Sequence, residues 1–400
     1  MLEQPLFGRR LRQLRTERGL TLAALAGEGM STGYLSRLES GARQPTERAI
    51  THLATQLGIS PAVLTQSTAT SLAESLTLAT GLSQDEGGQT LSNALKTSRG
   101  EDPLLRWQAL WQVAEWRQWR QEYAEQRTCL DELVALSAQI GLPELQSRVL
   151  AALSRCMRST GEIVGAVDAA THAYELAERE ALPARVRAST LLALVSALAE
   201  AGRLPDAARH ADELLTLADQ VSGALRAQAV WTVANIRVRQ GDLDTGAQLM
   251  NQAIDGFDGR DDLTLWTRLR LGAARLDLRA DPPRTESARR RVTEVQAAMP
   301  FAGVPAIEQQ LLAVRARIAV LAGDLDEART VLDRLTGFDD LLTYQERMRL
   351  DVLRNRVLLL EGEQDTALAG LRKLAEQAQQ SGNMDLAADI WRLVAESLTK

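Results

Sequence analysis

The sequence predicts an all-α protein, with an N-terminal block of five short helices followed by a right-handed α-solenoid of about eight helical hairpins. Apolar residues recur at positions i, i+3, i+4 and i+7 almost throughout the chain, which is typical of amphipathic helices. Aromatic residues make up only 4% of the sequence, and no run of β-branched residues alternates with polar ones, so strands are not expected. Turn signals recur every 39 to 42 residues between 161 and 362, which indicates a helical repeat.

The composition is that of an ordinary globular protein. The 400 residues are 45% hydrophobic and 24% charged, within the usual range. No stretch reaches the roughly 18 uninterrupted apolar residues of a membrane span, and the first residues lack the apolar core of a signal peptide. We therefore expect a cytoplasmic protein with no membrane partner. Cys129 and Cys156 are interpreted as buried reduced thiols rather than a disulfide.

The charge is divided unevenly along the chain. The net charge is −6, yet residues 1–65 contain eight arginines against five acidic residues. This segment is thus about +3 and the remainder about −9. A small basic head on a large acidic body is expected when only the head contacts nucleic acid.

The predicted helices of the head are delimited by caps and glycines. They span 5–18, 22–26, 32–40 and 47–57, and a short fifth helix starts at Ser60-Pro61. Thr21, Ser31 and Thr46 are suitable N-caps. Residues 65–71, TQSTATS, are small and polar. We place the domain boundary there, which gives a DNA-binding domain over 1–66 and a helical-repeat sensor or dimerisation domain over 67–400.

The third of these helices carries the residues suited to reading DNA. Its apolar positions, which anchor it to the head, are Met30, Tyr34, Leu35 and Leu38. The residues left to face outward are Ser31, Thr32, Gly33, Ser36 and Arg37. Arg37 is the best candidate for a bidentate contact with guanine, whereas Ser31 could serve only as a helix cap. The arginines placed for backbone phosphate are Arg9, Arg10, Arg12 and Arg43; alternatively, each is a solvated surface residue.

This segment resembles the Cro/repressor-like (XRE) helix-turn-helix family over about 60 of the 400 residues. The resemblance lies in LRQLRTERGLTLAALA, MSTGYLSRLESGARQPT and LATQLGIS. It implies that Glu39 is structural and that the outward residues of the third helix form the recognition surface. The family often has Gln at the start of the second helix, where this chain has Leu22. Such domains usually bind palindromic double-stranded DNA as dimers, so a homodimer is expected.

The rest of the chain repeats a helical pair. The predicted turns are Gly161-Glu162, Gly202-Arg203, Gly241-Asp242, Asp281-Pro282, Gly323-Asp324 and Gly362-Glu363. Five residues after most of them stands a small residue that would let two helices approach closely: Ala166, Ala207, Gly246, Ala328 and Ala367. Around Pro282-Pro283 the turn looks extended. Two earlier pairs are expected over 72–98 and 103–140, and a single helix over 384–399 ends the array.

These pairs resemble the longer tetratricopeptide (TPR) repeats, whose first helices line a concave groove. Two polar positions recur in each first helix, six and thirteen residues before the turn. The first set is Arg155, Ser196, Asn235, Arg275, Arg317 and Arg356, and the second is Arg148, Ser189, Gln228, Arg268, Gln310 and Arg349. Acidic residues are absent from both sets. We interpret them, with Trp231, as a groove that binds carboxylates and peptide amides. Alternatively, these residues only form the solvent-exposed face that each first helix needs, and they bind no ligand.

No catalytic constellation emerges from the sequence. His52, His172 and His210 are scattered without metal-ligand spacing, and there is no phosphate-binding glycine loop or nucleophile elbow. We expect no enzyme, no metal and no cofactor. A XRE head before a TPR-like body resembles the RRNPP class of quorum-sensing regulators in bacteria, which implies a dimeric transcription factor controlled by a signalling peptide or other small ligand. Alternatively, the repeat domain is a protein-interaction or dimerisation scaffold.

Overall fold

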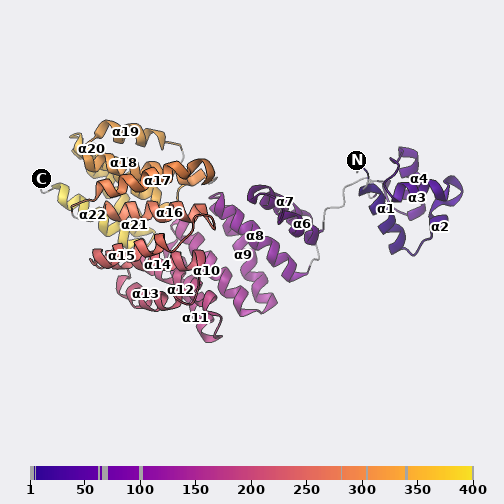
Figure 1. The fold of residues 1–400 in the computed structure, drawn as a ribbon, viewed down its shortest axis with the longest axis horizontal. Coiled ribbons are helices and arrows are strands. Elements are labelled where there is room, and N and C mark those ends of the chain that lie inside the picture. The colour runs from indigo at the N-terminus through magenta and orange to yellow at the C-terminus, as the bar shows by residue number, and fades with distance from the viewer. Residues whose placement is uncertain are drawn as a thin grey trace. The chain divides into compact units, whose positions relative to one another are not determined.

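The computed structural model describes residues 4, 6–61, 64, 71–98, 102–280, 282–302, 305–337 and 341–398. Within these ranges every regular element is a helix (Figure 1). The chain divides into two compact units, 1–109 and 110–400, which are described separately. The segment around 66, where the sequence predicts a domain boundary, lies largely outside the described residues, so that boundary stays a prediction.

The described part of the head contains short α-helices that begin within one residue of the predicted starts, and a 3-10 helix over 27–29, where the sequence predicts a turn. They are α1 (Leu6–Glu17), α2 (Leu22–Ala26), the 3-10 helix η1 (Gly27–Gly29), α3 (Thr32–Glu39) and α4 (Glu47–Leu57). Thr21, Ser31 and Thr46 each accept a hydrogen bond from an amide of the first turn, which satisfies an otherwise unpaired donor. The ends of α1 and α3 fall one residue before the predicted ones. Most of the predicted fifth helix, after Ser60-Pro61, lies outside the described residues.

A leucine-rich core joins the helices of the head. Phe7 and Leu11 of α1, Leu35 and Leu38 of α3 and Leu53 of α4 are fully buried. These positions follow the helical period that the sequence shows. The apolar side of α3 is thereby turned inward, and its opposite side is left for solvent.

Two further helices belong to the first unit. They are α6 (Leu72–Ala79) and α7 (Gln84–Thr97), and they form a pair, as the sequence predicts for 72–98. Ser71 with Glu74, and Ser83 with Glu86, form complete capping boxes at their starts. The helix α8 (Pro103–Trp119) spans the division between the units.

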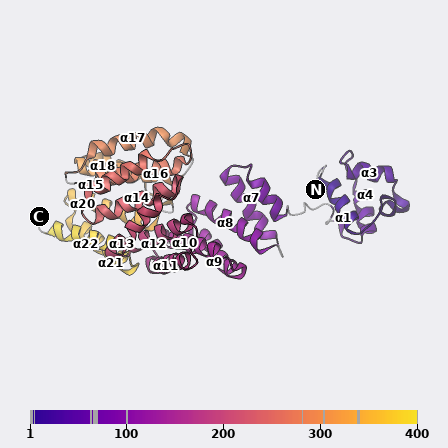
Figure 2. The same cartoon turned by 60° about the horizontal axis from the view of Figure 1, so that its bottom comes forward.

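The second unit is an array of antiparallel helix pairs (Figures 1 and 2). Its helices are α9 (Tyr123–Ile140), α10 (Pro143–Thr160), α11 (Ile163–Arg179), α12 (Ala184–Glu200), α13 (Leu204–Ala218), α14 (Gly223–Arg239), α15 (Leu243–Asp255), α16 (Leu263–Asp277), α17 (Thr285–Ala302), α18 (Pro305–Ala322), α19 (Leu325–Arg334), α20 (Tyr344–Leu360), α21 (Gln364–Gln380) and α22 (Met384–Leu398). The predicted turns at 161, 202, 241, 323 and 362 and the single last helix are confirmed, whereas Asp281 of the remaining predicted turn lies outside the described residues.

The small residues after the turns sit where paired helices touch. Ala166, Ala207, Ala328 and Ala367 are all fully buried, and a side chain at Gly246 would collide with Val238. The turn between α16 and α17 is longer than the others, as the sequence suggests. There the equivalent buried residue is Ala288, which lies two positions later than the regular spacing requires.

The array curves until its last helices meet its early ones. Helix α20 packs against α10, and α22 packs against α12. A side chain at Gly161, in the turn after α10, would come within 2.7 Å of the Tyr344 ring at the start of α20. In the same way, one at Gly202 would come within 2.8 Å of Met384 at the start of α22. We call these two contacts the closing seam.

A membrane-spanning helix needs both sufficient length and high mean hydropathy. Among the residues that the structure describes, no helix combines the length and hydropathy needed to cross a bilayer.

Candidate nucleic-acid interface and ligand site

The outward side of α3 presents the residues that the sequence singles out. Thr32, Gly33, Ser36 and Arg37 are exposed. Ser31 is exposed too, and its hydroxyl accepts a hydrogen bond from the Tyr34 amide at 3.2 Å, so it does act as the cap. The backbone and side chains of this surface are therefore available to a major groove, which admits an α-helix. Their contact with bases stays a prediction.

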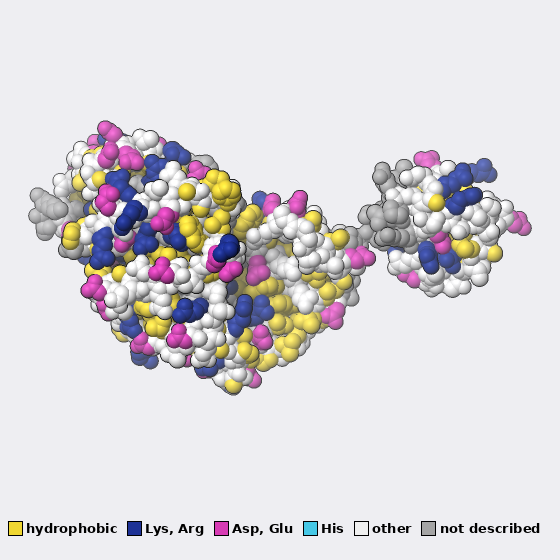
Figure 3. Space-filling view, viewed as in Figure 1, with side chains coloured by type: hydrophobic (Ala, Val, Ile, Leu, Met, Phe, Trp, Pro, Cys, Tyr) yellow, Lys and Arg dark blue, Asp and Glu magenta, His cyan; other side chains and the backbone are white. Residues whose placement is uncertain are grey.

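The basic residues around α3 differ in how freely they can move. The Arg37 guanidinium has no hydrogen bond or ion pair with any described residue, whereas the Arg43 guanidinium lies over the Tyr34 ring, 4.7 Å from its centroid. On α1, Arg12 is exposed. Among the described residues, Arg10 donates one long hydrogen bond to Gln13, at 3.5 Å, and its Nε is buried without a partner. Basic side chains stand out on the face of the head seen in Figure 3.

Arg9 lies in α1, and its side chain is outside the described residues. Its predicted phosphate contact, like those of Arg10, Arg12 and Arg43, stays a prediction.

Two residues that sequence reasoning missed hold α3 in place. Arg15 donates to both carboxylate oxygens of Glu39, at 2.7 and 3.0 Å. Gly8 lets α1 lie directly against the end of α3, because any side chain there would collide with the Leu38 carbonyl oxygen. The structural role that the family resemblance implies for Glu39 agrees with this pair. No sequence signal identifies its partner, since five arginines lie within α1 and the turn after it.

In the second unit, six arginines from four first helices and the turn after one of them lie close together. We call them the interior arginine cluster: Arg239 of α14, Arg275 and Arg279 at the end of α16, Arg317 of α18, and Arg349 and Arg356 of α20. Arg275 and Arg279 act electrostatically on both Arg317 and Arg349. Arg356 also acts on Arg317, and Arg239 acts on Arg349, so the six charges lie close to one another. Burial, reinforced by these neighbours, lowers the pKa of Arg317 and of Arg349 to about 10.

Three carboxylates reach this cluster from positions outside the predicted polar sets. Asp385 of α22 lies 3.1 Å from Arg239, and Asp389 lies 3.0 Å from Arg279. Glu346 of α20 lies 3.5 Å from Arg275 and also accepts a hydrogen bond from Gln310 at 2.8 Å. The absence of acidic residues from the predicted sets therefore does not leave the interior free of them. Asp385 and Asp389 reach the cluster from the last helix through the curvature of the array, so the spacing along first helices could not reveal them.

Several of the remaining predicted groove residues have surroundings of their own. Asn235 donates to the Trp231 carbonyl oxygen of its own helix. The indole nitrogen of Trp231 is buried with no hydrogen-bond partner among the described residues. Arg268 is exposed and Gln228 is half-buried.

Arg155 lies apart from the interior arginine cluster. Burial lowers its pKa, and the neighbouring Glu115 acts against this shift. The structure thus brings together Arg275, Arg317, Arg349 and Arg356, with Gln310 joined to them through Glu346. Arg268 and Glu346 both act electrostatically on the hydroxyl of Tyr123. Ligand contact by any of these residues stays a prediction.

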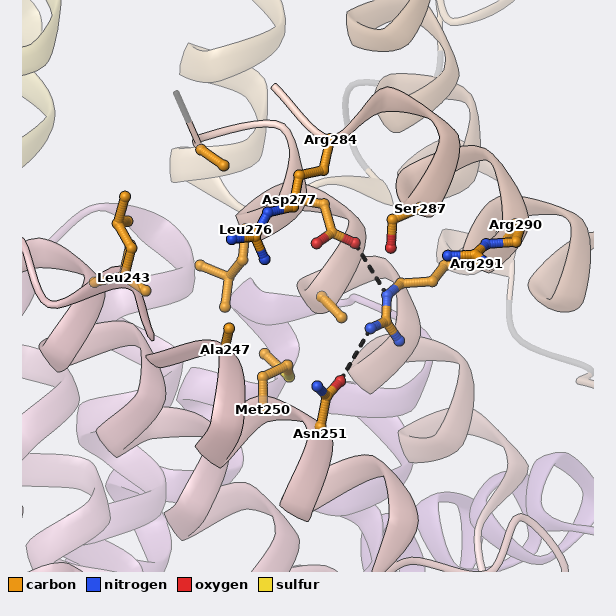
Figure 4. Close-up of a pocket in the computed structure, with 13 residues that line it drawn as sticks. Leu243, Ala247, Met250, Asn251, Leu276, Asp277, Arg284, Ser287, Arg290 and Arg291 are labelled. Carbon is orange, nitrogen blue, oxygen red and sulfur yellow. Dashed lines mark hydrogen bonds and ion pairs between the residues drawn. The ribbon is translucent and has the colours of Figure 1, made fainter. Parts of the chain in front are cut away.

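A separate pocket of about 280 Å³ opens between α14, α15, α16 and α17 (Figure 4). Its floor is apolar, with Leu243, Met250 and Leu276. Arg291 crosses it, donating to Asp277 at 3.2 Å and to Asn251 at 3.1 Å. Its charge is already neutralised by Asp277, and its two hydrogen bonds link α17 to α16 and α15. We therefore interpret Arg291 as a structural residue. Sequence spacing gives no sign of this pocket.

The N-terminal segment is a helix-turn-helix domain. Residues 6–66 match the family described by that name. No sequence among the curated proteins matches the chain.

Solved structures share the fold of the whole chain. The Rap conjugation gene regulator of plasmid pLS20, in complex with the Phr* peptide, aligns with a TM-score of 0.56 at 12% identity, covering 94% of this chain and 96% of that one. A Rap protein complexed with competence and sporulation factor gives 0.54 at 12%, covering 98% and 97%. NprR in complex with its cognate peptide NprX gives 0.53 at 10%, covering 98% of both. The fold is thus a helical-repeat array with an N-terminal helix-turn-helix domain.

Proposed function

We propose that this protein is a sequence-specific DNA-binding transcriptional regulator whose repeat domain binds a short peptide inside its curve. The observation that carries the proposal is the combination of a free, outward-facing Arg37 on α3 with an arginine cluster enclosed by the repeats. The solved structures that share the fold, Rap and NprR, are complexes with peptides, which supports the choice of ligand class. The two-pronged ion pair between Arg15 and Glu39, whose side chains are largely shielded from solvent, supports a rigid DNA-binding domain.

The DNA target is a palindromic operator bound by a homodimer. Each head, about residues 1–66, is too small to bury the surface of a tight specific complex alone. Two heads held one helical turn apart would supply it, and the repeat domain, 67–400, would set their spacing. The contacts would come from Ser31, Thr32, Gly33, Ser36 and Arg37 at bases and from the arginines of α1 and Arg43 at phosphates. Such a regulator works in the cytoplasm.

Control by the ligand requires two arrangements of the repeats. A ligand shifts an equilibrium only if it binds one arrangement better than the other. The closing seam supplies a discrete element that can be made or broken, because α20 and α22 contact α10 and α12 at two points. Peptide binding inside the curve would change the balance between closed and open arrays, and so the spacing of the two heads.

The test is selection of bound genomic DNA by the purified protein, repeated with and without peptides from a synthetic library. We expect a palindromic motif, and a peptide that changes the affinity for it. Arg356→Ala should keep DNA binding and abolish the response to the peptide, because this arginine has no partner among the described residues. Normal DNA binding with no responsive peptide would support a scaffold role instead, and absence of any selected motif would contradict the proposal as a whole.

A further inference from the structure

The interior arginine cluster is already partly filled by the protein itself. We infer that it binds an acidic peptide segment carrying at least two carboxylates, and that Asp385 and Asp389 of α22 occupy the same arginines until this ligand displaces them. The inference rests on the proposed function, since it names the chemistry of the ligand and the part of the fold that its arrival would release.

The charges inside the cluster do not balance. Six arginines face the carboxylates of Glu346, Asp385 and Asp389. Arg349 and Arg356 make no hydrogen bond or ion pair with any described residue, and Arg317 makes only a long hydrogen bond of 3.5 Å to the Leu278 carbonyl oxygen. Guanidiniums withdrawn from water without partners are costly. An anion is therefore needed to complete the site.

Arg349 indicates that the excess positive charge of the cluster is shielded from solvent. Burial is the largest cause of its lowered pKa, yet part of its surface still meets solvent. Its guanidinium is therefore shielded by the protein and still open to solvent. At a pKa of about 10 its guanidinium remains charged at neutral pH, so it can attract a carboxylate that enters.

The two aspartates of α22 are loosely held. Arg239 and Asp385 are 3.1 Å apart, but Nη1 of Arg239 and Oδ2 of Asp385 are both buried without a hydrogen-bond partner among the described residues. Asp389 is shared between Arg279 and the exposed Arg392, at 3.0 Å each. A two-pronged ion pair is stronger than one that is misaligned or shared between two arginines. Breaking the pairs of Asp385 and Asp389 therefore costs less free energy than breaking two-pronged pairs would.

The class of ligand follows from what the cluster already accepts. All three groups within ion-pair distance of these arginines are side-chain carboxylates, and a planar guanidinium matches a carboxylate in two-pronged geometry. Asp385 and Asp389 stand four residues apart on one helix, so they present two carboxylates from a single face. A peptide with two nearby acidic side chains would reproduce that spacing.

Displacement would act on the closing seam. Asp385 follows Met384, whose side chain covers Gly202, and α22 packs against α12. Once a ligand takes the arginines, the ion pairs that draw α22 toward α14 and α16 are lost. The acidic ligand would thereby loosen the same contact that closes the array.

The experiment measures binding to the full-length protein by isothermal titration at constant ionic strength. The probes are tetraglutamate, tetraglutamine and inorganic pyrophosphate. The variants are Arg349→Met, the double variant Asp385→Asn/Asp389→Asn, and Arg260→Gln as control. Arg260 is 91% exposed, and its ion pair among the described residues is with Asp258 of the same turn, so its loss removes one positive charge without touching the cluster.

We expect tetraglutamate to bind at least tenfold more tightly than tetraglutamine. Arg349→Met should weaken tetraglutamate at least tenfold without lowering the melting temperature, because replacing an unpaired buried charge by an apolar group does not destabilise. The double variant should bind tetraglutamate about tenfold more tightly, and the control should bind it as the wild type does. If the double variant unfolds, Asp389→Asn alone serves, because its ion pairs are partly exposed.

Unchanged or weaker binding by the aspartate variant would overturn the inference, as would wild-type binding by Arg349→Met. Absence of tetraglutamate binding would overturn it as well, and pyrophosphate binding alone would identify a phosphate site instead. None of these readings involves DNA. If tetraglutamate binds as expected but the protein selects no DNA motif, the proposed function is refuted and the carboxylate site remains. If the protein binds DNA and responds to a peptide but the tetraglutamate results fail, the carboxylate site is refuted and the proposed function remains.

Discussion

Arg15 on α1 and Glu39 at the end of α3 form a two-pronged ion pair, with nitrogen–oxygen distances of 2.7 and 3.0 Å. Both side chains are largely buried, at 14% and 8% exposure. Arg15 also donates to the Leu20 carbonyl oxygen at 2.8 Å. The pair therefore ties three segments of the head together and fixes the direction of the helix that faces DNA.

Replacing Arg15 by Ala should destabilise the head by about 2–3 kcal/mol, because it leaves the Glu39 carboxylate buried without its partner. The loss should appear as faster amide hydrogen exchange in α1 and α3 of the full-length protein. Arg12→Ala is the matched control, since Arg12 is an exposed arginine of the same helix. Equal exchange in the two variants would show that the pair does not hold α3.

Replacing Arg37 by Ala should weaken binding to the specific operator by roughly 1–3 kcal/mol and relax the preference at one base pair. Its guanidinium has no partner among the described residues, so the change should leave the head folded. The measurement is a selected-binding motif, with affinities at two salt concentrations. Arg12→Ala should instead lower affinity for all sequences alike and reduce the salt slope by about 1. An unchanged motif for Arg37→Ala would rule out a base contact.

Replacing Gly161 by Ala should open the closing seam. Its φ of +92° is left-handed, and a side chain would press on the Tyr344 ring at 2.7 Å. Gly241 is the control, because its φ is +90° and nothing lies within 4 Å of the added atom. Both variants should lose about 1 kcal/mol of stability to backbone strain. Only Gly161→Ala should also speed hydrogen exchange at the start of α20, and equal exchange there would argue against the seam.

Cys156 should resist alkylation in the folded protein. Burial raises the pKa of its thiol to about 12 from an ordinary 9, so the reactive thiolate is scarce. At pH 9, iodoacetamide should label it on the order of 100-fold more slowly in the folded protein than in urea, as read by mass spectrometry. Because the raised pKa favours the protonated native state, its contribution to stability is complete below pH 9 and is lost between pH 9 and 12. Comparable labelling rates in the two states would contradict burial.

The sequence anticipated most of the fold because its signals are local. Caps such as Ser31 and Thr46 and glycines such as Gly161 act within one turn of helix, so helix boundaries fall within a residue or two of those expected. The small residues that follow the turns report helix pairing, because close packing of neighbours requires them at a constant offset. Where the offset changes, at Ala288, the turn itself has lengthened.

The candidate sites also differ in whether their residues could be found from local sequence signals or only from tertiary contacts. The outward face of α3 could be assigned from the spacing of Leu35 and Leu38, because the helical period alone fixes which side chains lie on the buried face and which lie opposite. The partner of Glu39 and the obligatory small residue at Gly8 could not, because they depend on how α1 crosses α3. The predicted polar sets found four of the six clustered arginines and missed the carboxylates that meet them.

The sequence by itself determined that this chain is helical, that it repeats, and that a basic reading helix precedes an arginine-bearing array, because each of these is written in contacts between near neighbours. Only the tertiary structure decided that the array curves far enough to bring Asp385 and Asp389 against Arg239 and Arg279. Curvature accumulates from small rotations at every pair of repeats, and no single repeat encodes where the last helix will come to lie.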